Sequence, residues 1–262
     1  MEIKGKHIYI TGANRGIGRA LAKAFHKEGG FVHILCRNPD DSNLDDLRDV
    51  DGYVIERLDV STSQAIETFM NHLEDSGATV DIWVNNAGML TGGLIEDQDM
   101  DEVYQMIQVN LTAVIHLTSK VVGLMVQQQG SKKIINNASV SGVMNLPLAS
   151  TYTAAKSGVV AFTRSLAAEL EKTNISTLAL ITPGIKTRMF DEISQRYGDK
   201  MDVSGLSSIP PEDYAREVIQ AVKDDRDEYW PKGSVRWPLL LAQHAPKLFK
   251  LGASRFFDRK DG

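Results

Sequence analysis

A glycine-rich turn between an apolar run and a helical run restricts the fold of this chain more than any other feature. His7–Ile10 is a short apolar run, Thr11–Gly18 has the sequence TGANRGIG, and Ala20–Lys27 has apolar residues at helical spacing. Glycines let a backbone approach a ligand closely, and a helix N-terminus offers free N–H groups to a phosphate. The spacing differs from the common G-x-G-x-x-G fingerprint, so an ordinary tight turn is the alternative for this motif alone.

Strand and helix patterns alternate along the rest of the chain without a linker or a repeat. The further predicted strands are Phe31–Cys36, Tyr53–Leu58, Val80–Val84, Lys132–Ala138, Ile175–Ile181 and Glu228–Trp230. Helices are predicted from Ala65 onward (with Ser61 as the cap), over Met100–Met125, over Tyr152–Lys172 and over Pro211–Val222. This alternation predicts one α/β domain over residues 1–262, a Rossmann-like doubly wound parallel sheet flanked by helices. Ligands bind at the carboxyl ends of the strands in such a sheet.

Composition excludes several classes of function. The chain has 262 residues and a net charge of −5, which argues against nucleic-acid binding. The single cysteine, Cys36, excludes an internal disulfide and fits a reducing compartment, so we expect a cytoplasmic protein. Six scattered histidines without ligand spacing predict no metal site. No signal peptide and no 18-residue apolar run are apparent, so no membrane span is expected.

Tyr152 and Lys156 form a pair with acid–base potential. Residues four apart share one helix face and lie about 6 Å apart along the axis. Ser139 follows the predicted strand at 132–138 and can reach the same face. An ammonium beside a phenol favours the phenolate, so the phenol can exchange a proton with a substrate. Such pairs also occur by chance, and a surface Tyr and Lys is the alternative.

Two arginines indicate which nucleotide the predicted crevice selects. An acid about 20 residues after the glycines would bind a free ribose 2′-hydroxyl, but Cys36-Arg37-Asn38 stands there, with no acid until Asp40. Arg37 suits a 2′-phosphate, and Arg15 in the glycine turn adds a second cation. The pair therefore predicts NADP, with two solvated arginines as the alternative.

Other strand ends carry polar or turn residues. Asp59-Val60 ends one strand and Asn85-Asn86-Ala87-Gly88 ends the next, where plain turn chemistry is the alternative. Thr182–Thr187 ends a later strand. Asn110 lies inside a predicted helix, where it either faces solvent or holds a kink that directs a carbonyl into the site.

The ordered set of motifs resembles the short-chain dehydrogenase/reductase superfamily, NADP-preferring type, over about residues 6–187. Ser139 lies thirteen residues before Tyr152, which is the usual family interval. The matching positions are Thr11, Gly12, Gly16, Gly18, Asp59, Asn85, Asn86, Ala87, Gly88, Asn110, Ser139, Tyr152 and Lys156. The chain departs from the pattern in one interval, because only two residues separate Gly184 from Thr187, where the family usually has three.

The resemblance implies roles for these residues. Tyr152 would be the proton donor or acceptor, Lys156 would assist the phenol and hold the nicotinamide ribose, Ser139 would bind the substrate oxygen, and Asn110 would anchor a proton-relay water. The implied cofactor-binding residues are Gly12, Asn14, Arg15, Gly16, Ile17, Gly18, Arg37, Asn38, Asp59, Val60, Asn86, Ala87, Gly88, Tyr152, Lys156, Pro183, Gly184, Ile185 and Thr187.

Two segments outside the motifs are candidates for substrate recognition. Residues 188–211 mix helix formers with Gly and Pro and are predicted to form a lid over the strand ends, with a disordered loop as the alternative. Residues 231–262 form an amphipathic extension that could lie on a membrane surface, cover a partner subunit or dock on its own domain. The extension is similar to those of family members that act on steroids and other lipid-like substrates.

Together these features predict an NADP(H)-dependent oxidoreductase. It would interconvert a ketone or aldehyde and the corresponding alcohol by hydride transfer, on a small, apolar or lipid-like substrate. A dimer or tetramer of identical chains is expected, located in the cytoplasm or peripherally at a membrane. The alternatives are a non-catalytic NADP-binding regulatory protein and a membrane-surface scaffold.

Overall fold

A seven-stranded parallel sheet forms the centre of the computed structural model, which describes residues 1–197, 208–233 and 236–244. The strand order is β3-β2-β1-β4-β5-β6-β7. The strands are β1 (His7–Thr11), β2 (Phe31–Cys36), β3 (Tyr53–Arg57), β4 (Ile82–Asn85), β5 (Lys132–Asn137), β6 (Ile175–Leu180) and β7 (Glu228–Tyr229). The order reverses between β1 and β4, and a doubly wound sheet has its ligand crevice at that switch point. The predicted Rossmann-like architecture is confirmed.

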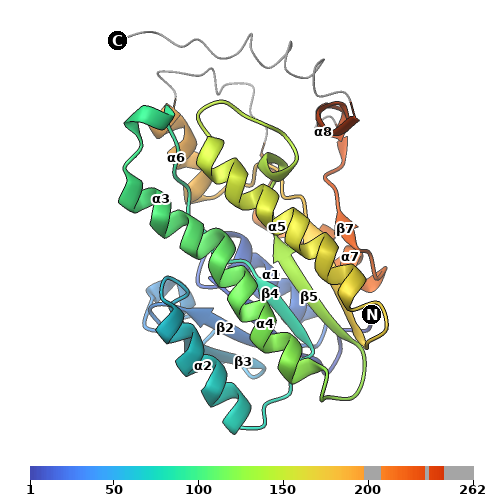
Figure 1. Ribbon diagram of the computed structural model, residues 1–262. Coiled ribbons are helices and arrows are strands. Elements are labelled where there is room, and N and C mark those ends of the chain that lie inside the picture. The colour runs from blue at the N-terminus through green and yellow to red at the C-terminus, as the bar shows by residue number, and fades with distance from the viewer. Residues whose placement is uncertain (198–207, 234–235, 245–262) are drawn as a thin grey trace.

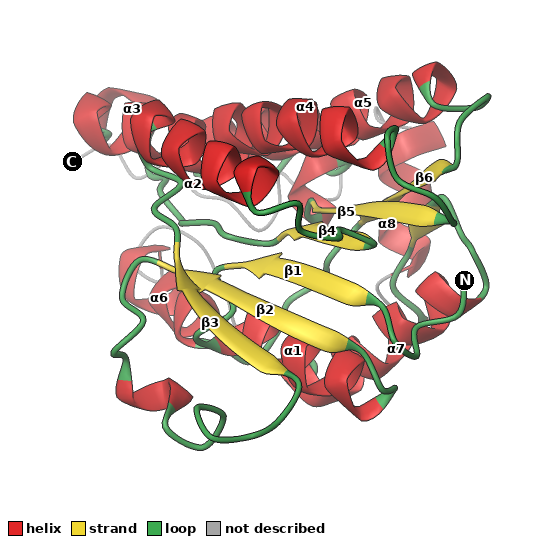
Figure 2. Ribbon diagram, turned by 90° about the horizontal axis from the view of Figure 1, so that it is seen from below, coloured by secondary structure: helices red, strands yellow, loops and turns green. Residues whose placement is uncertain are grey.

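Helices cover both faces of the sheet (Figure 2). On one face lie α1 (Gly16–Lys27) and α7 (Pro211–Lys223), and on the other α2 (Ser63–Asp75), α4 (Ala113–Met125) and α5 (Ser150–Glu169). Side chains alternate across a strand, so Ile8 and Ile10 of β1 enter the core under α1 and α7. Tyr9 enters the core under α2 and α4. Both faces are therefore buried, as a parallel sheet requires.

The segment Met100–Met125 is interrupted around Asn110, where a kink was one of the two alternatives. It consists of α3 (Met100–Ile107), a π-helical turn (Gln108–Thr112) and α4. By length and mean hydropathy alone this run could cross a membrane, contrary to the expectation that no segment could. Leu117 and Val121, however, share a core with Trp83 of β4. A core helix of an α/β domain passes the same test of length and hydropathy.

The chain after β6 supplies shorter elements near the carboxyl ends of the strands. Figure 1 shows α6 (Arg188–Tyr197) and α8 (Arg236–His244) toward the end of the molecule to which β5 points. The predicted lid segment starts as α6, and Ile209 near its end forms a parallel bridge with Ile185 in the segment that follows β6. The 3-10 turns are Ser42–Leu44, Ile95–Asp97 and Val140–Gly142. Residues 198–207 of the predicted lid and 234–235 and 245–262 of the predicted extension lie outside the described residues.

Candidate active site

The glycine turn after β1 packs directly on the turn after β4. A Cβ added to Gly12 would lie 2.9 Å from the Ala87 Cα, and one added to Gly18 would lie 2.5 Å from Asn86 Nδ2. Asn86 Nδ2 donates to the Thr11 carbonyl at 2.9 Å. Thr11 Oγ1 accepts the backbone N–H groups of Asn86 and Ala87 at 2.9 and 3.0 Å. Only glycine fits these contacts, so the turn is held at the switch point of the sheet.

The start of α1 faces a residue that follows β6. Gly16 begins α1 with φ 53°, and the helix has no acidic residue in its first turn. Its free N–H groups therefore form an uncompensated anion-binding end. A Cβ on Gly16 would lie 3.3 Å from Thr187 Cγ2. The short interval after Gly184 thus still brings Thr187 beside the glycine turn.

Lys156 and Asn110 flank Gly88 at the end of β4. A Cβ on Gly88 would lie 3.3 Å from Asn110 Oδ1 and 3.9 Å from Lys156 Nζ. Asn110 is fully buried in the π-helical turn, where its Oδ1 accepts from Met89 N at 2.9 Å and its Nδ2 donates to Met89 O at 2.8 Å. The solvent-facing alternative for Asn110 is therefore wrong. π-Helical turns are frequent at functional sites.

The Lys156 ammonium lies beside the Tyr152 ring. Lys156 is only 5% exposed, and its Nζ lies 5.9 Å from the centre of that ring. Nζ donates to the carbonyl of Asn137 at 2.8 Å. Burial lowers the pKa of Lys156 from 10.5 to about 8. The amine is thus charged at neutral pH and can lose its proton within an accessible pH range.

Ser139 joins this face through the turn that follows β5. Ser139 is buried and caps the Val140–Gly142 turn, its Oγ accepting from Ser141 N at 3.1 Å. That turn packs tightly on α5, because a Cβ on Gly142 would lie 2.8 Å from the carbonyl oxygen of Lys156. The hydroxyl of Ser139 is therefore fixed next to the helix that carries the phenol and the ammonium.

The outer part of the crevice, beyond the glycine turn, is more exposed and more charged. Arg15 and Arg37 are exposed, and neither guanidinium has a hydrogen-bond or ion-pair partner within the described part of the chain. Asp41 Oδ2 accepts from Asn14 Nδ2 at 2.6 Å. Hydrogen bonds from the Asn43 N–H and from Asn14 lower the pKa of Asp41, and Arg15 adds to the shift. A carboxylate thus lies near Arg15, one of the two cations that predicted a 2′-phosphate.

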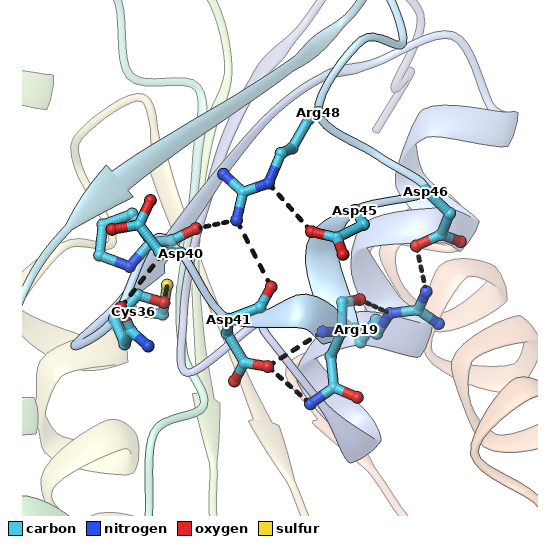
Figure 3. Close-up of polar contacts among 10 residues, drawn as sticks. Arg19, Cys36, Asp40, Asp41, Asp45, Asp46 and Arg48 are labelled. Atoms are coloured by element: carbon cyan, nitrogen blue, oxygen red, sulfur yellow. Dashed lines mark hydrogen bonds and ion pairs between the residues drawn. The ribbon is translucent and has the colours of Figure 1, made fainter.

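Ion pairs within the loop after β2, and between that loop and α1, stabilise the loop. Arg48 donates to Asp45 Oδ1 at 3.2 Å, and Arg19 of α1 donates to Asp46 Oδ1 at 2.5 Å (Figure 3). The sequence analysis did not identify Asp41 as a site residue. The sequence does contain a signal that could have identified it. Several acidic residues lie between positions 40 and 49, close in the sequence to one of the two arginines.

The remaining predicted cofactor residues line the same edge. Asn38 Oδ1 accepts from Asp40 N at 3.2 Å, and Asp59 Oδ1 accepts from Ser61 N at 2.9 Å after β3. Of the other members, Val60 and Ile185 are buried, and Ile17, Pro183 and Gly184 are partly buried. Among the described residues, no group of three His, Cys, Asp or Glu side chains could hold a metal ion.

Within the described part of the predicted extension, the one named helix is α8. Leu239 in α8 is fully buried and Leu241 is 42% exposed. At least one of its leucines therefore docks on the domain.

Known proteins resemble this chain in sequence and in fold. A family model described as short chain dehydrogenase matches residues 6–198. The 3-oxoacyl-[acyl-carrier-protein] reductase FabG of Haemophilus influenzae is 31% identical over 235 residues, which are 85% of this chain and 93% of that protein.

Two solved structures share the fold at lower identity. A short chain dehydrogenase/reductase from Burkholderia phymatum in complex with NAD has a TM-score of 0.80 at 23% identity, covering 95% of this chain and 96% of that one. A short chain dehydrogenase from Burkholderia cenocepacia in complex with NADP has a TM-score of 0.81 at 19% identity, covering 97% and 99%. One neighbour holds NAD and the other NADP, so the likeness leaves the choice of dinucleotide open.

Proposed function

Because the chain belongs to the short-chain dehydrogenase/reductase family, we propose that it is an NADP(H)-dependent oxidoreductase that interconverts a ketone or aldehyde and the corresponding alcohol. The observation that carries the proposal is the buried ammonium of Lys156, one helical turn from Tyr152 and beside Gly88. A buried charge is costly unless it is hydrogen-bonded, and Lys156 Nζ is held by the carbonyl of Asn137 at 2.8 Å. Here it lies where it can favour the phenolate form of a proton-exchanging tyrosine.

The residues present fit a dinucleotide. The glycine turn leaves no room for a Cβ at Gly12 or Gly18, and the N-terminus of α1 offers its N–H groups to a pyrophosphate. A bound nicotinamide supplies or accepts the hydride. Tyr152 gives a proton to the carbonyl oxygen during reduction and takes it back from the alcohol during oxidation. Ser139 donates a hydrogen bond to the same substrate oxygen.

The preference for NADP rests on Arg15 and Arg37. Both are exposed cations at the adenosine end of the crevice, where a 2′-phosphate would add two negative charges. Asp41 opposes this preference, because its carboxylate is bonded to Asn14 in the same turn. Two exposed cations outweigh one carboxylate that already accepts several hydrogen bonds.

The substrate class is an apolar or lipid-like carbonyl compound. Support comes from the leucine-rich extension, of which α8 is the described part, and from relatives named as 3-oxoacyl-[acyl-carrier-protein] reductases. Residues 188–211 act as the lid, because α6 follows Thr187 at the glycine turn. We place the protein in the cytoplasm as a dimer or tetramer of identical chains.

The experiment that tests the proposal is an NADPH-oxidation screen. The carbonyl compounds would be ketones, aldehydes and 3-oxoacyl thioesters graded in chain length, with the Tyr152→Phe variant as the blank. We expect wild-type turnover that rises with acyl-chain length and vanishes in the variant. Tight NADPH binding without turnover on any substrate would contradict the proposal and favour the non-catalytic regulatory alternative.

A further inference from the structure

We propose that Asn137, linked through Thr182 to Tyr214 of α7, is a positioning residue that holds the glycine turn and Lys156 in one frame. This inference rests on the proposed function, because it concerns cofactor binding at the same site. It arises from a hydrogen-bond relay that crosses the ends of β6, β5, β4 and β1 beneath the proposed cofactor site.

Each member of this relay donates a hydrogen bond to the next member. Thr182 Oγ1 donates to Asn137 Oδ1 at 2.5 Å. A threonine hydroxyl has one hydrogen, so the Tyr214 hydroxyl, 2.6 Å from Thr182 Oγ1, is the donor in that contact. Asn137 Nδ2 then donates to Asn86 Oδ1 at 3.0 Å, and Asn86 Nδ2 donates to the Thr11 carbonyl at 2.9 Å. The relay thus leads from α7 to the glycine turn.

Burial makes the relay costly to break. Tyr214 is fully buried, and Thr182, Asn137 and Thr11 are each more than nine-tenths buried. Burial raises the pKa of Tyr214, so its phenol remains a neutral donor. Water cannot easily replace a bond lost here, and a buried polar group left unpaired carries its full desolvation cost.

Asn137 is the residue at which two parts of the site meet. Its side chain belongs to the relay, while its backbone carbonyl accepts from Lys156 Nζ at 2.8 Å. Its partner Asn86 in turn packs against Gly18, with Nδ2 at 2.5 Å from a Cβ built there. A shift at Asn137 therefore moves both the proposed catalytic amine and the turn that would hold the pyrophosphate.

The chain offers variants that separate positioning from packing. Tyr214→Phe removes one hydroxyl and keeps the ring, which packs edge-on against Tyr229 at 5.4 Å. Tyr229→Phe is the matched control, because the Tyr229 hydroxyl donates to Glu217, outside the relay. Thr182→Val breaks the relay at its next member, and Thr182→Ser keeps the hydroxyl.

The test is the Kd for NADPH of each folded variant, measured by titration well below its Tm. We expect a rise of about three- to tenfold in Tyr214→Phe and in Thr182→Val, wild-type affinity in Tyr229→Phe, and recovery to near wild type in Thr182→Ser. The double variant Tyr214→Phe, Thr182→Val should be no weaker than Thr182→Val alone, since the relay is already cut.

The inference can be overturned alone or together with the proposed function. Equal Kd values for Tyr214→Phe and Tyr229→Phe, or additive effects in the double variant, would mean that the relay only fills the core. A wild-type protein that binds neither NADPH nor NADH would contradict the proposed function and the relay's role with it. Nucleotide binding by wild type with unchanged variants contradicts the relay alone.

Discussion

The two halves of the carboxyl edge of the sheet satisfy their polar groups in different ways. In the catalytic half, at the ends of β4, β5 and β6, the polar groups are buried and hydrogen-bonded to one another, as in the 2.8 Å bond from Asn85 Nδ2 to Asn136 Oδ1. In the adenosine half, formed by the glycine turn and the loop after β2, Arg15 and Arg37 are exposed and Asp41 is partly exposed.

This difference separates what positions the proposed catalytic residues from what selects NADP or NAD. Buried groups have few alternative partners, so the positions of Lys156 and Asn110 follow from the fold itself. Exposed charges compete with water, and they can be exchanged without disturbing the fold. We infer that the catalytic half sets the chemistry and that a small balance of surface charges sets which dinucleotide binds.

The largest expected effect is in the catalytic half. Tyr152→Phe should lower kcat by about 10²–10⁴-fold, because it removes the proton donor and leaves the ring in place. NADPH affinity should stay nearly unchanged, since the adenosine half is untouched. Steady-state kinetics and a binding titration on the same preparation check both. If more than about a tenth of wild-type kcat remains, Tyr152 is not the essential acid.

A double substitution in the adenosine half should reverse the dinucleotide preference. Cys36→Asp with Arg37→Ile introduces an acceptor for the 2′-hydroxyl and removes a cation that suits the 2′-phosphate. A charge-assisted contact is worth about 1.5–3 kcal/mol, or about ten- to a hundredfold in affinity. The Kd values for NADH and NADPH measure the change. Retention of the wild-type preference would show that residues other than Cys36 and Arg37 select the dinucleotide.

The pH dependence of kcat/KM should report the protonation of the buried Lys156 amine. Because burial lowers the pKa of Lys156 from 10.5 to about 8, the ammonium loses its proton as pH rises through about 8. The kcat/KM for NADPH in the reductive direction reports the free enzyme, so it should fall above pH 8 by up to about tenfold per pH unit. Lys120→Gln, which changes an exposed amine paired with Glu67, should leave the profile unchanged. A flat profile between pH 7 and 10 would contradict the lowered pKa of Lys156.

The smallest effect concerns the carboxylate that the sequence analysis missed. Asp41→Asn keeps an acceptor for Asn43 but removes a negative charge beside Asn14, so NADPH should bind about two- to fivefold more tightly while NADH changes less. Asp40→Asn is the control, as a neighbouring exposed acid whose own backbone N–H bonds Asn38. An equal change for both nucleotides would mean that Asp41 shapes the loop and not the preference.

The sequence predicted the fold and the strand ends because hydrophobic alternation and glycine spacing are local signals. It left open whether Asn110 faces solvent or holds a kink, because the bonds of that side chain to Met89 are tertiary contacts. The Asn14–Asp41 bond and the Tyr214–Thr182–Asn137 relay likewise join residues 27 to 45 positions apart. No spacing rule indicates such pairs, since the fold alone brings them together.

The central claim is that chemistry and dinucleotide preference belong to separate halves of the site. The most direct test is the wild-type enzyme with one carbonyl substrate, assayed with NADPH and with NADH over a full concentration range. We predict kcat values within about threefold of each other and a KM at least about tenfold lower for NADPH. Similar KM values with kcat values that differ about tenfold or more would contradict the claim, because the 2′-phosphate would then act on the chemistry itself.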